Sequence, residues 1–206
     1  DDEGLVSCMF WGLGSDGTVS ANKNAIKIIG ACTDKYIQAY FEYDGKKSGG
    51  LTKSHLRFGQ RPILASYGIS RADFVACHKA SFLHKYDMWS VLKPGGAFLL
   101  NCAWDEADLK RELPDAFKRF ALENHIRLYT IDASRIAEDL GLGSRTNTLL
   151  QAAFFGITKV ISIEQAAAKM KESALKTYGS KGDDVVAKNY QAVDAALEQV
   201  RAYEIT

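Results

Sequence analysis

Near the start of the chain, a strand-like apolar run leads directly into a glycine-rich loop. Residues 5–10 read LVSCMF, and Gly12, Gly14 and Gly17 follow the spacing G-x-G-x-x-G. In dinucleotide-binding folds this spacing turns the chain tightly between a strand and a helix, and the N–H groups at the helix start then face a phosphate. The loop therefore predicts a strand–loop–helix unit with an anion-binding turn, or a glycine-rich turn that only changes the chain direction.

Five residues of this loop are candidates for contact with a cofactor. Gly14 and Gly17 let the backbone approach the ligand, and Ser15 and Thr18 add hydroxyl donors. Asp16 has the wrong charge for a phosphate, so we expect its carboxylate to point away from one or to cap the turn.

The second strand helps to discriminate between ligands. Residues 36–44, YIQAYFEYD, run into a glycine-flanked loop that contains Lys46 and Lys47. An acidic residue near this point, Glu42 or Asp44, keeps an NAD-binding interpretation open. Two consecutive lysines favour a more heavily phosphorylated nucleotide, although a solvated turn has the same composition.

A further glycine stretch, GLGSRTNT over residues 141–148, lies between two helical segments. Arg145 offers a guanidinium fork and Asn147 an amide, both of which suit a phosphate or the edge of an adenine or of a pantetheine amide. Alternatively, Asn147 caps the helix that begins there.

Strand-like segments alternate with helical patterns through most of the chain, which predicts an α/β fold with a Rossmann-like βαβ sheet, largely parallel. A helix over 105–120 should be disturbed at Pro114. The expected strands are residues 5–10, 36–43, 51–58, 73–77, 97–101 and 127–131, and the other expected helices are residues 18–29 and 134–140.

From Asn147 onward the chain has helical patterns and no convincing strand. Ser162 and Gln165 form a capping-box pattern that should open a helix to about Tyr178. An amphipathic helix is expected over 186–200, after a hinge-like stretch over 178–182. We therefore expect an α/β domain over residues 1–160, followed by a C-terminal helical extension of the same domain over residues 161–206.

Composition limits the classes of function. The formal net charge is +1 and no basic patch stands out, so we expect no nucleic-acid partner. The sequence has no membrane-length apolar run and starts with acidic residues, so we expect a cytoplasmic protein that does not bind membranes. Cys77, His78 and His84 do not complete a tetrahedral metal site, and no nucleophile motif is visible, so neither a metal nor a catalytic residue is predicted.

Four stretches in order, GLGSDGTVSANKN, YDGKKSGGLTKSHLRFG, DFVACH and GLGSRTN, closely resemble the γ-type domain of pyruvate:ferredoxin (flavodoxin) oxidoreductases, members of the 2-oxoacid:acceptor oxidoreductase family. The resemblance covers nearly the whole chain. It implies a coenzyme A-binding domain of a larger enzyme that converts pyruvate to acetyl-CoA and CO₂. Its site residues would be Gly14, Ser15, Asp16, Gly17, Thr18, Lys46, Lys47, Arg145 and Asn147.

The same resemblance implies cofactors and partners that this chain does not hold. Thiamine diphosphate, magnesium and [4Fe-4S] clusters are expected only in the other domains of the parent enzyme, which is expected to be a homodimer. Ferredoxin or flavodoxin would meet the whole enzyme. Two other hypotheses stay open, an NAD(P)-binding dehydrogenase domain and a structural docking domain whose glycine loops are only turns.

Overall fold

The computed structural model describes residues 3–44 and 49–206. The strands form one seven-stranded sheet with the order β2-β3-β1-β4-β5-β6-β7. The central strands β1, β4, β5 and β6 are parallel to one another, whereas β3 pairs antiparallel with both β1 and β2, and β7 pairs antiparallel with β6. The strands are β1 (Leu5–Leu13), β2 (Tyr36–Tyr43), β3 (Leu51–Gly59), β4 (Ala72–Cys77), β5 (Leu92–Asn101), β6 (Arg127–Ile131) and β7 (Arg201–Tyr203).

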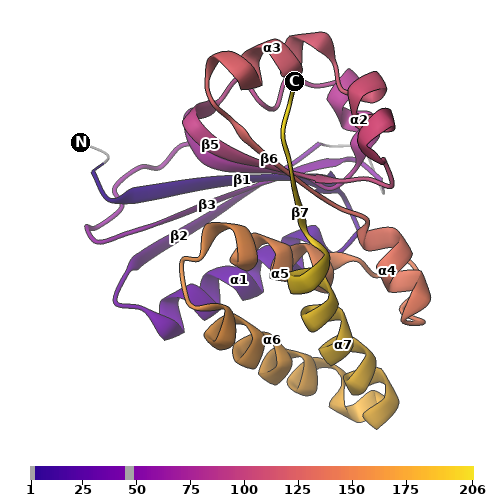
Figure 1. Cartoon of the computed structure of the whole chain (residues 1–206). Coiled ribbons are helices and arrows are strands. Elements are labelled where there is room, and N and C mark those ends of the chain that lie inside the picture. The colour runs from indigo at the N-terminus through magenta and orange to yellow at the C-terminus, as the bar shows by residue number, and fades with distance from the viewer. Residues whose placement is uncertain (1–2, 45–48) are drawn as a thin grey trace.

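Helices cover both faces of this sheet (Figure 1). The short pair α2 and α3 lies on one face, and α1, α4, α5, α6 and α7 lie on the other. The helices are α1 (Thr18–Cys32), α2 (Glu106–Glu112), α3 (Asp115–Glu123), α4 (Ala133–Asp139), α5 (Asn147–Thr158), α6 (Ile163–Tyr178) and α7 (Asp183–Gln199), with 3₁₀ turns η1 (Ala80–His84) and η2 (Gly179–Lys181).

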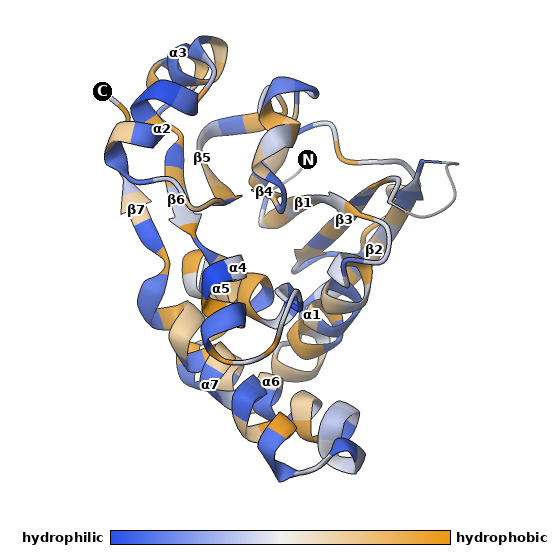
Figure 2. Ribbon diagram, turned by 90° about the vertical axis from the view of Figure 1, so that its right-hand side faces the viewer, coloured by the Kyte–Doolittle hydropathy of each residue, from blue (hydrophilic) through white to orange (hydrophobic). Residues whose placement is uncertain are grey.

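The hydrophobic pattern explains this layering. Strand β1 is apolar on both faces, as a central strand requires, and its side chains enter two separate cores. Helix α5 is apolar nearly all round, with the sequence NTLLQAAFFGIT. It is buried between the sheet and the outer helices. Figure 2 shows hydrophilic and hydrophobic residues alternating along α6 and α7, as expected for outer helices.

The predicted α/β class, with a parallel centre and C-terminal helices, is confirmed. The expected disturbance at Pro114 is a break: α2 ends before it and α3 begins after it, since proline lacks the N–H that a continuous helix needs. The capping box of Ser162 and Gln165 opens α6 as predicted. Strand β7 contradicts the expectation of no strand after Asn147, because three residues are too few to show a strand pattern.

The stretch over 178–182 forms η2 and the turn into α7. Lys171 of α6 and Asp194 of α7 pair at 2.9 Å, and both helices contribute to the same hydrophobic core. The joint therefore lies between two helices that pack together. Within the described ranges, no helix is long and apolar enough to cross a membrane.

Candidate functional site

The glycine loop connects β1 to α1 at the carboxyl end of the parallel strands. Strand β1 leads through α1 to β2 on one side of the sheet, whereas β4, its parallel neighbour, leads to β5 on the other. In open α/β sheets, ligands bind in the crevice where the direction of connection reverses. The topology therefore places this loop at the expected position of a binding site.

Asp16 caps the turn, which was one of the two roles expected for it. Its carboxylate accepts hydrogen bonds from the N–H groups of Leu13 at 2.9 Å and Thr18 at 2.8 Å. Among the described residues, the N–H groups of Ser15 and Gly17 have no acceptor. These two groups, rather than the Thr18 N–H, are the donors that the loop can offer to an anion.

The loop lies directly beside the end of the β2–β3 hairpin. The Gly14 N–H donates to the Gly50 carbonyl oxygen at 2.7 Å, and the Asp44 N–H donates to Leu51 at 2.9 Å across the hairpin. Lys46 and Lys47 fall outside the described residues. After this gap, Gly49 and Gly50 lie next to Gly14 of the glycine loop.

The Thr18 hydroxyl faces the interior of the protein. Its Oγ1 lies 2.8 Å from Nδ1 of His78, and the residue is 1% exposed. Burial lowers the pKa of His78 to about 4, while the nearby Asp16 carboxylate opposes this shift, so the imidazole is neutral at neutral pH. The Thr18 side chain therefore fixes the start of α1 against β4 instead of pointing toward solvent.

His78 is itself held by neighbouring strands. Its N–H donates to the Trp11 carbonyl at 2.9 Å, and its carbonyl accepts from the Asn101 side-chain amide at 3.2 Å. The side-chain oxygen Oδ1 of Asn101 accepts from the Ala133 N–H at 3.0 Å, at the start of α4. A continuous network thus joins the carboxyl ends of β1, β4, β5 and β6 to the glycine loop.

The second glycine stretch meets the first one. Gly17 has a φ angle of +87°, and a Cβ atom built on it would lie 3.1 Å from Cγ and Nδ2 of Asn147. Asn147 is the first residue of α5, where Thr146 is the N-cap and no side-chain capping bond forms, so the alternative role of Asn147 as a cap is wrong. The Asn147 amide packs against the backbone of the glycine loop instead.

Arg145 lies further out on the same stretch. Its Nε donates to the Leu142 carbonyl at 3.1 Å, and its guanidinium carbon lies 5.8 Å from the ring centroid of Tyr178. Lys181 approaches the same ring at 5.6 Å. The structure thus brings Gly14–Thr18 together with Asn147, and places two cations around Tyr178 near them.

The geometry does not favour an NAD-type ribose contact from Glu42. Strand β3 lies between β1 and β2, whereas in dinucleotide-binding sheets the acidic second strand is the direct neighbour of the first. The Glu42 carboxylate instead lies 3.3 Å from Nε2 of His55 and 4.0 Å from Nζ of Lys53.

His55 and Arg57 share one face of β3, as their alternation predicts, but the chain itself covers both. The Ile69 N–H donates to Nδ1 of His55 at 3.0 Å, and Arg57 donates to Gln38 at 2.8 Å beneath the ring of Tyr67. Both side chains are therefore buried within this chain. Burial lowers the pKa of His55, against the opposing effect of Glu42.

The remaining thiols and imidazoles form no metal site within residues 3–44 and 49–206. The Cys77 Sγ donates to the Lys79 carbonyl at 3.0 Å, and burial raises the pKa of the thiol to about 12. Cys77 is thus a protonated, structural thiol.

Sequence reasoning missed the roles of His78 and Asn101. His78 ends the stretch DFVACH and was weighed only as a metal ligand, although a histidine at the carboxyl end of a strand beside a glycine loop is also well placed to support that loop. Asn101 likewise ends its strand, β5. The position of both residues at strand ends was a usable signal.

Comparison with known proteins identifies relatives along nearly the whole chain. The family model for pyruvate ferredoxin/flavodoxin oxidoreductase matches residues 7–199. A pyruvate-flavodoxin oxidoreductase of Klebsiella pneumoniae is 53% identical over 96% of this chain, and a pyruvate:ferredoxin oxidoreductase of Moorella thermoacetica is 51% identical over 95%. This chain spans only 17% of the length of each.

Solved structures share the fold at lower sequence identity. A pyruvate oxidoreductase subunit from Thermotoga maritima matches with a TM-score of 0.75 at 19% identity, covering 98% of this chain and 99% of that one. A 2-oxoglutarate:ferredoxin oxidoreductase from Magnetococcus marinus, with 2-oxoglutarate, coenzyme A and succinyl-CoA bound, matches with a TM-score of 0.69 at 18% identity. The match covers 94% of this chain and 30% of that one.

Proposed function

The chain belongs to the pyruvate ferredoxin/flavodoxin oxidoreductase family, and from this membership we propose that it is the coenzyme A-binding, γ-type domain of such an enzyme. The parent enzyme would oxidatively decarboxylate pyruvate to acetyl-CoA and CO₂ and pass electrons to ferredoxin or flavodoxin. Residues 1–160 would form the binding domain, and residues 161–206 its helical extension. Both parts contribute side chains to one hydrophobic core, in agreement with a single domain.

The observation that carries the proposal is the convergence of three separate segments at the carboxyl end of the sheet. Gly14 contacts Gly50, and Gly17 contacts Asn147, so the glycine loop, the hairpin end and the start of α5 surround one position. Backbone N–H groups of Ser15 and Gly17 point to an anion there. This arrangement suits a ligand with several phosphates.

Coenzyme A fits this donor set better than NAD. It carries a diphosphate, for the N–H groups of the loop, and a 3′-phosphate, for which Lys46 and Lys47 are available in the sequence. The Magnetococcus marinus relative in fold was solved with coenzyme A bound, which supports the same ligand here. The intervening strand β3 and the contacts of Glu42 with His55 and Lys53 weaken the NAD alternative.

This chain would bind and position the coenzyme without taking part in bond making. Bound coenzyme A supplies a thiol that accepts the acetyl group. Asp16 holds the turn through two N–H groups, His78 holds Thr18, and Asn147 supports Gly17. Thiamine diphosphate, magnesium and the iron–sulfur clusters would belong to other domains of the homodimeric parent.

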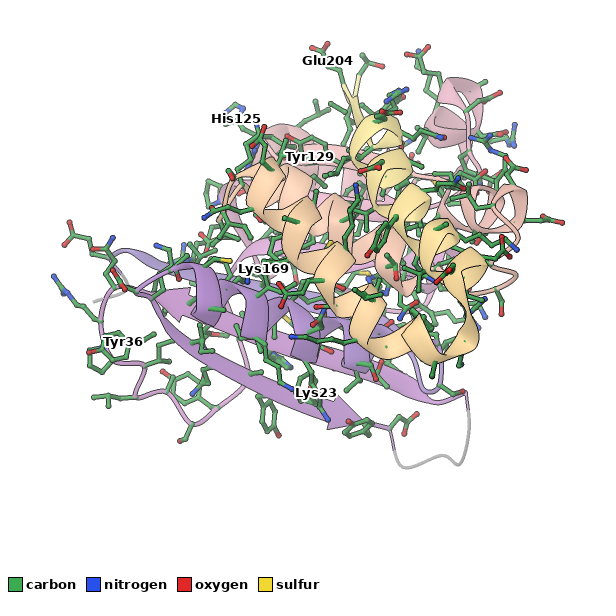
Figure 3. All side chains as sticks on the ribbon, turned by 90° about the horizontal axis from the view of Figure 1, so that it is seen from below. Lys23, Tyr36, His125, Tyr129, Lys169 and Glu204 are labelled. Atoms are coloured by element: carbon green, nitrogen blue, oxygen red, sulfur yellow. The ribbon has the colours of Figure 1, made fainter. Side chains whose placement is uncertain are left out.

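Exposed tyrosines on both faces of the edge strand β2 support contact with those other domains. Tyr36 and Tyr40, which share one face, are 51% and 45% exposed, and Tyr43 on the other face is 63% exposed. Tyr67, which lies over Arg57 of β3, is 67% exposed. Figure 3 labels Tyr36 at the start of β2, away from the helical layer. Since tyrosine is enriched in protein interfaces, and relatives are far longer than this chain, we place neighbouring domains of the parent on this edge.

Isothermal titration of the chain with coenzyme A, NADH and NADPH separates the three hypotheses. The proposal expects saturable binding of coenzyme A and much weaker binding of both dinucleotides. Tighter binding of NADH or NADPH would support the dehydrogenase alternative. Absence of heat with all three would support a docking domain.

A further inference from the structure

A cavity of about 380 Å³ opens beside the glycine loop, between α1, α5 and α6. It begins at Gly17 and Asn147, which both line it, and extends along the helices to Tyr178. Figure 3, which looks onto the helical layer, shows α6 lying beside α1. The cavity is therefore continuous with the position proposed for the phosphates.

The lining of this cavity is unusually polar for a space between packed helices. It includes the side chains of Ser20, Asn24, Asn147, Gln151, Ser173 and Thr177. Three of these six carry carboxamides, which have both donor and acceptor atoms in one plane. Such groups match the edge of a heterocyclic base, which also presents donors and acceptors in one plane.

Gln151 is the most informative of these residues. It is 8% exposed, and its Nε2 has no acceptor among the described protein groups. A buried amide without a partner is unfavourable, so a ligand atom that accepts from Nε2 would bind favourably. On α5, Gln151 lies one turn after Asn147, which places both amides on the same side of the helix.

Asn24 adds a second donor. Its Oδ1 accepts from the Ser173 hydroxyl at 3.1 Å, which leaves the hydrogen-bonding capacity of its Nδ2 unused by Ser173, and both residues line the cavity. Tyr178 adds an aromatic ring to the lining, and a base gains binding energy from contact with such a ring. Arg145 and Lys181 approach this ring and add positive charge beside it.

We infer that this cavity holds the adenine base of the coenzyme, with Gln151 donating to a ring nitrogen. The inference rests on the proposed function. The adenine end of coenzyme A, and not its thiol end, lies in the cavity, because the thiol must reach groups in other domains. An end of the coenzyme that is buried between α1, α5 and α6 cannot reach them. Gln151, Asn24 and Tyr178 are then specificity-determining residues for the nucleotide.

The test measures dissociation constants by titration for three ligands: coenzyme A, adenosine 3′,5′-bisphosphate, which lacks the pantetheine arm, and 4′-phosphopantetheine, which lacks the nucleoside. In Gln151→Glu the donor is lost and the size is kept. The loss of one buried hydrogen bond should raise the dissociation constants of the two adenine ligands about tenfold and leave that of 4′-phosphopantetheine unchanged. Gln151→Leu should do the same.

Gln191→Glu is the matched control, because Gln191 is exposed on α7 and should change none of the three constants. Tyr178→Leu should also weaken the two adenine ligands selectively. Unchanged coenzyme A binding in Gln151→Glu would overturn the inference alone. A loss shared by 4′-phosphopantetheine would also overturn it, and would assign the cavity to the pantetheine arm. Failure of the unmodified chain to bind coenzyme A would contradict the proposed function and, with it, this inference.

Discussion

The side chain of Asn147 occupies the space that a side chain at Gly17 would need. A Cβ atom on Gly17 would lie 3.1 Å from the Asn147 amide, and the Gly17 φ of +87° is strained for any other residue. The two glycine stretches, which are far apart in the sequence, are thereby fixed against each other. The anion-binding turn depends on this contact.

Replacing Gly17 should therefore lower the unfolding free energy more than replacing a glycine that has a positive φ angle but no close neighbour. Gly143 has a φ of +62° with nothing within 4 Å of its Cβ position, so Gly143→Ala should destabilise the protein by about 1–2 kcal/mol. Gly17→Ala should destabilise it further, and adding Asn147→Ala should remove only part of this extra loss, because the Cβ of residue 147, 3.2 Å from the Gly17 Cβ position, is kept. Urea unfolding measures these differences, and equal effects of the two glycine variants would contradict the contact.

The buried pair of His78 and Thr18 should make stability depend on pH. The folded-state pKa of His78, about 4, lies below its ordinary value of 6.5, so between these values the unfolded chain binds more protons than the folded one. The unfolding free energy should thus rise with pH through this window and fall as the pH is lowered.

His78→Gln should reduce the slope of unfolding free energy against pH by an amount that corresponds to at most one bound proton. Unfolding at a series of pH values from 4 to 7 measures this slope. Some dependence should remain, because His55 also has a lowered pKa. If the slopes of the variant and the unmodified protein were the same, His78 would not be buried in its neutral form.

The lysine pair tests the phosphate contacts. If Lys46 and Lys47 approach the coenzyme, each contributes a charge-assisted contact of about 1.5–3 kcal/mol, so Lys46→Ala and Lys47→Ala should each raise the dissociation constant about tenfold or more. A lysine that contacts the 3′-phosphate should lose this effect with coenzyme A that lacks that group.

Lys110→Ala is a suitable control, because Lys110 is exposed on α2, which lies on the face of the sheet away from α1 and α5. Lys171 would be a poorer control, since it pairs with Asp194. Small and equal changes in affinity for all three lysine variants would mean that the loop is a solvated turn.

The exposed tyrosines of β2 should contribute little within this chain. Tyr36→Ser and Tyr43→Ser should each change its unfolding free energy by less than about 0.5 kcal/mol, since both side chains are largely exposed. In the full-length enzyme the same substitutions should lower the thermal midpoint, if neighbouring domains cover this edge. Thermal unfolding of both forms checks this, and an unchanged midpoint in the full-length enzyme would refute the proposed contact.

The sequence predicts the elements well because their signals are local. The apolar run before Gly12, the break at Pro114 and the capping box at Ser162 each depend on neighbours along the chain. Strand pairing is different: the alternation in β2 and β3 does not show that β3 inserts antiparallel between β1 and β2. Strand β7 is held by its pairing with β6 and has almost no pattern of its own.

The candidate site shows the same division. Gly14, Asp16 and Gly17 are close together in sequence, and the turn that they form follows from spacing and cap chemistry. The contact of Thr18 with His78 joins residues 60 positions apart, and Gln151 is one polar residue within an apolar helix. Such relationships arise from tertiary packing, which spacing along the chain does not encode.

The most direct test of coenzyme A binding at the glycine loop is a ¹H–¹⁵N NMR titration of the chain with coenzyme A. We expect large, saturable chemical-shift changes for the backbone amides of Ser15 and Gly17 and for the side-chain amides of Asn147 and Gln151. The backbone amide signals of α2 and α3 should not change. Saturable shifts confined to other surfaces, or no shifts at all, would contradict it.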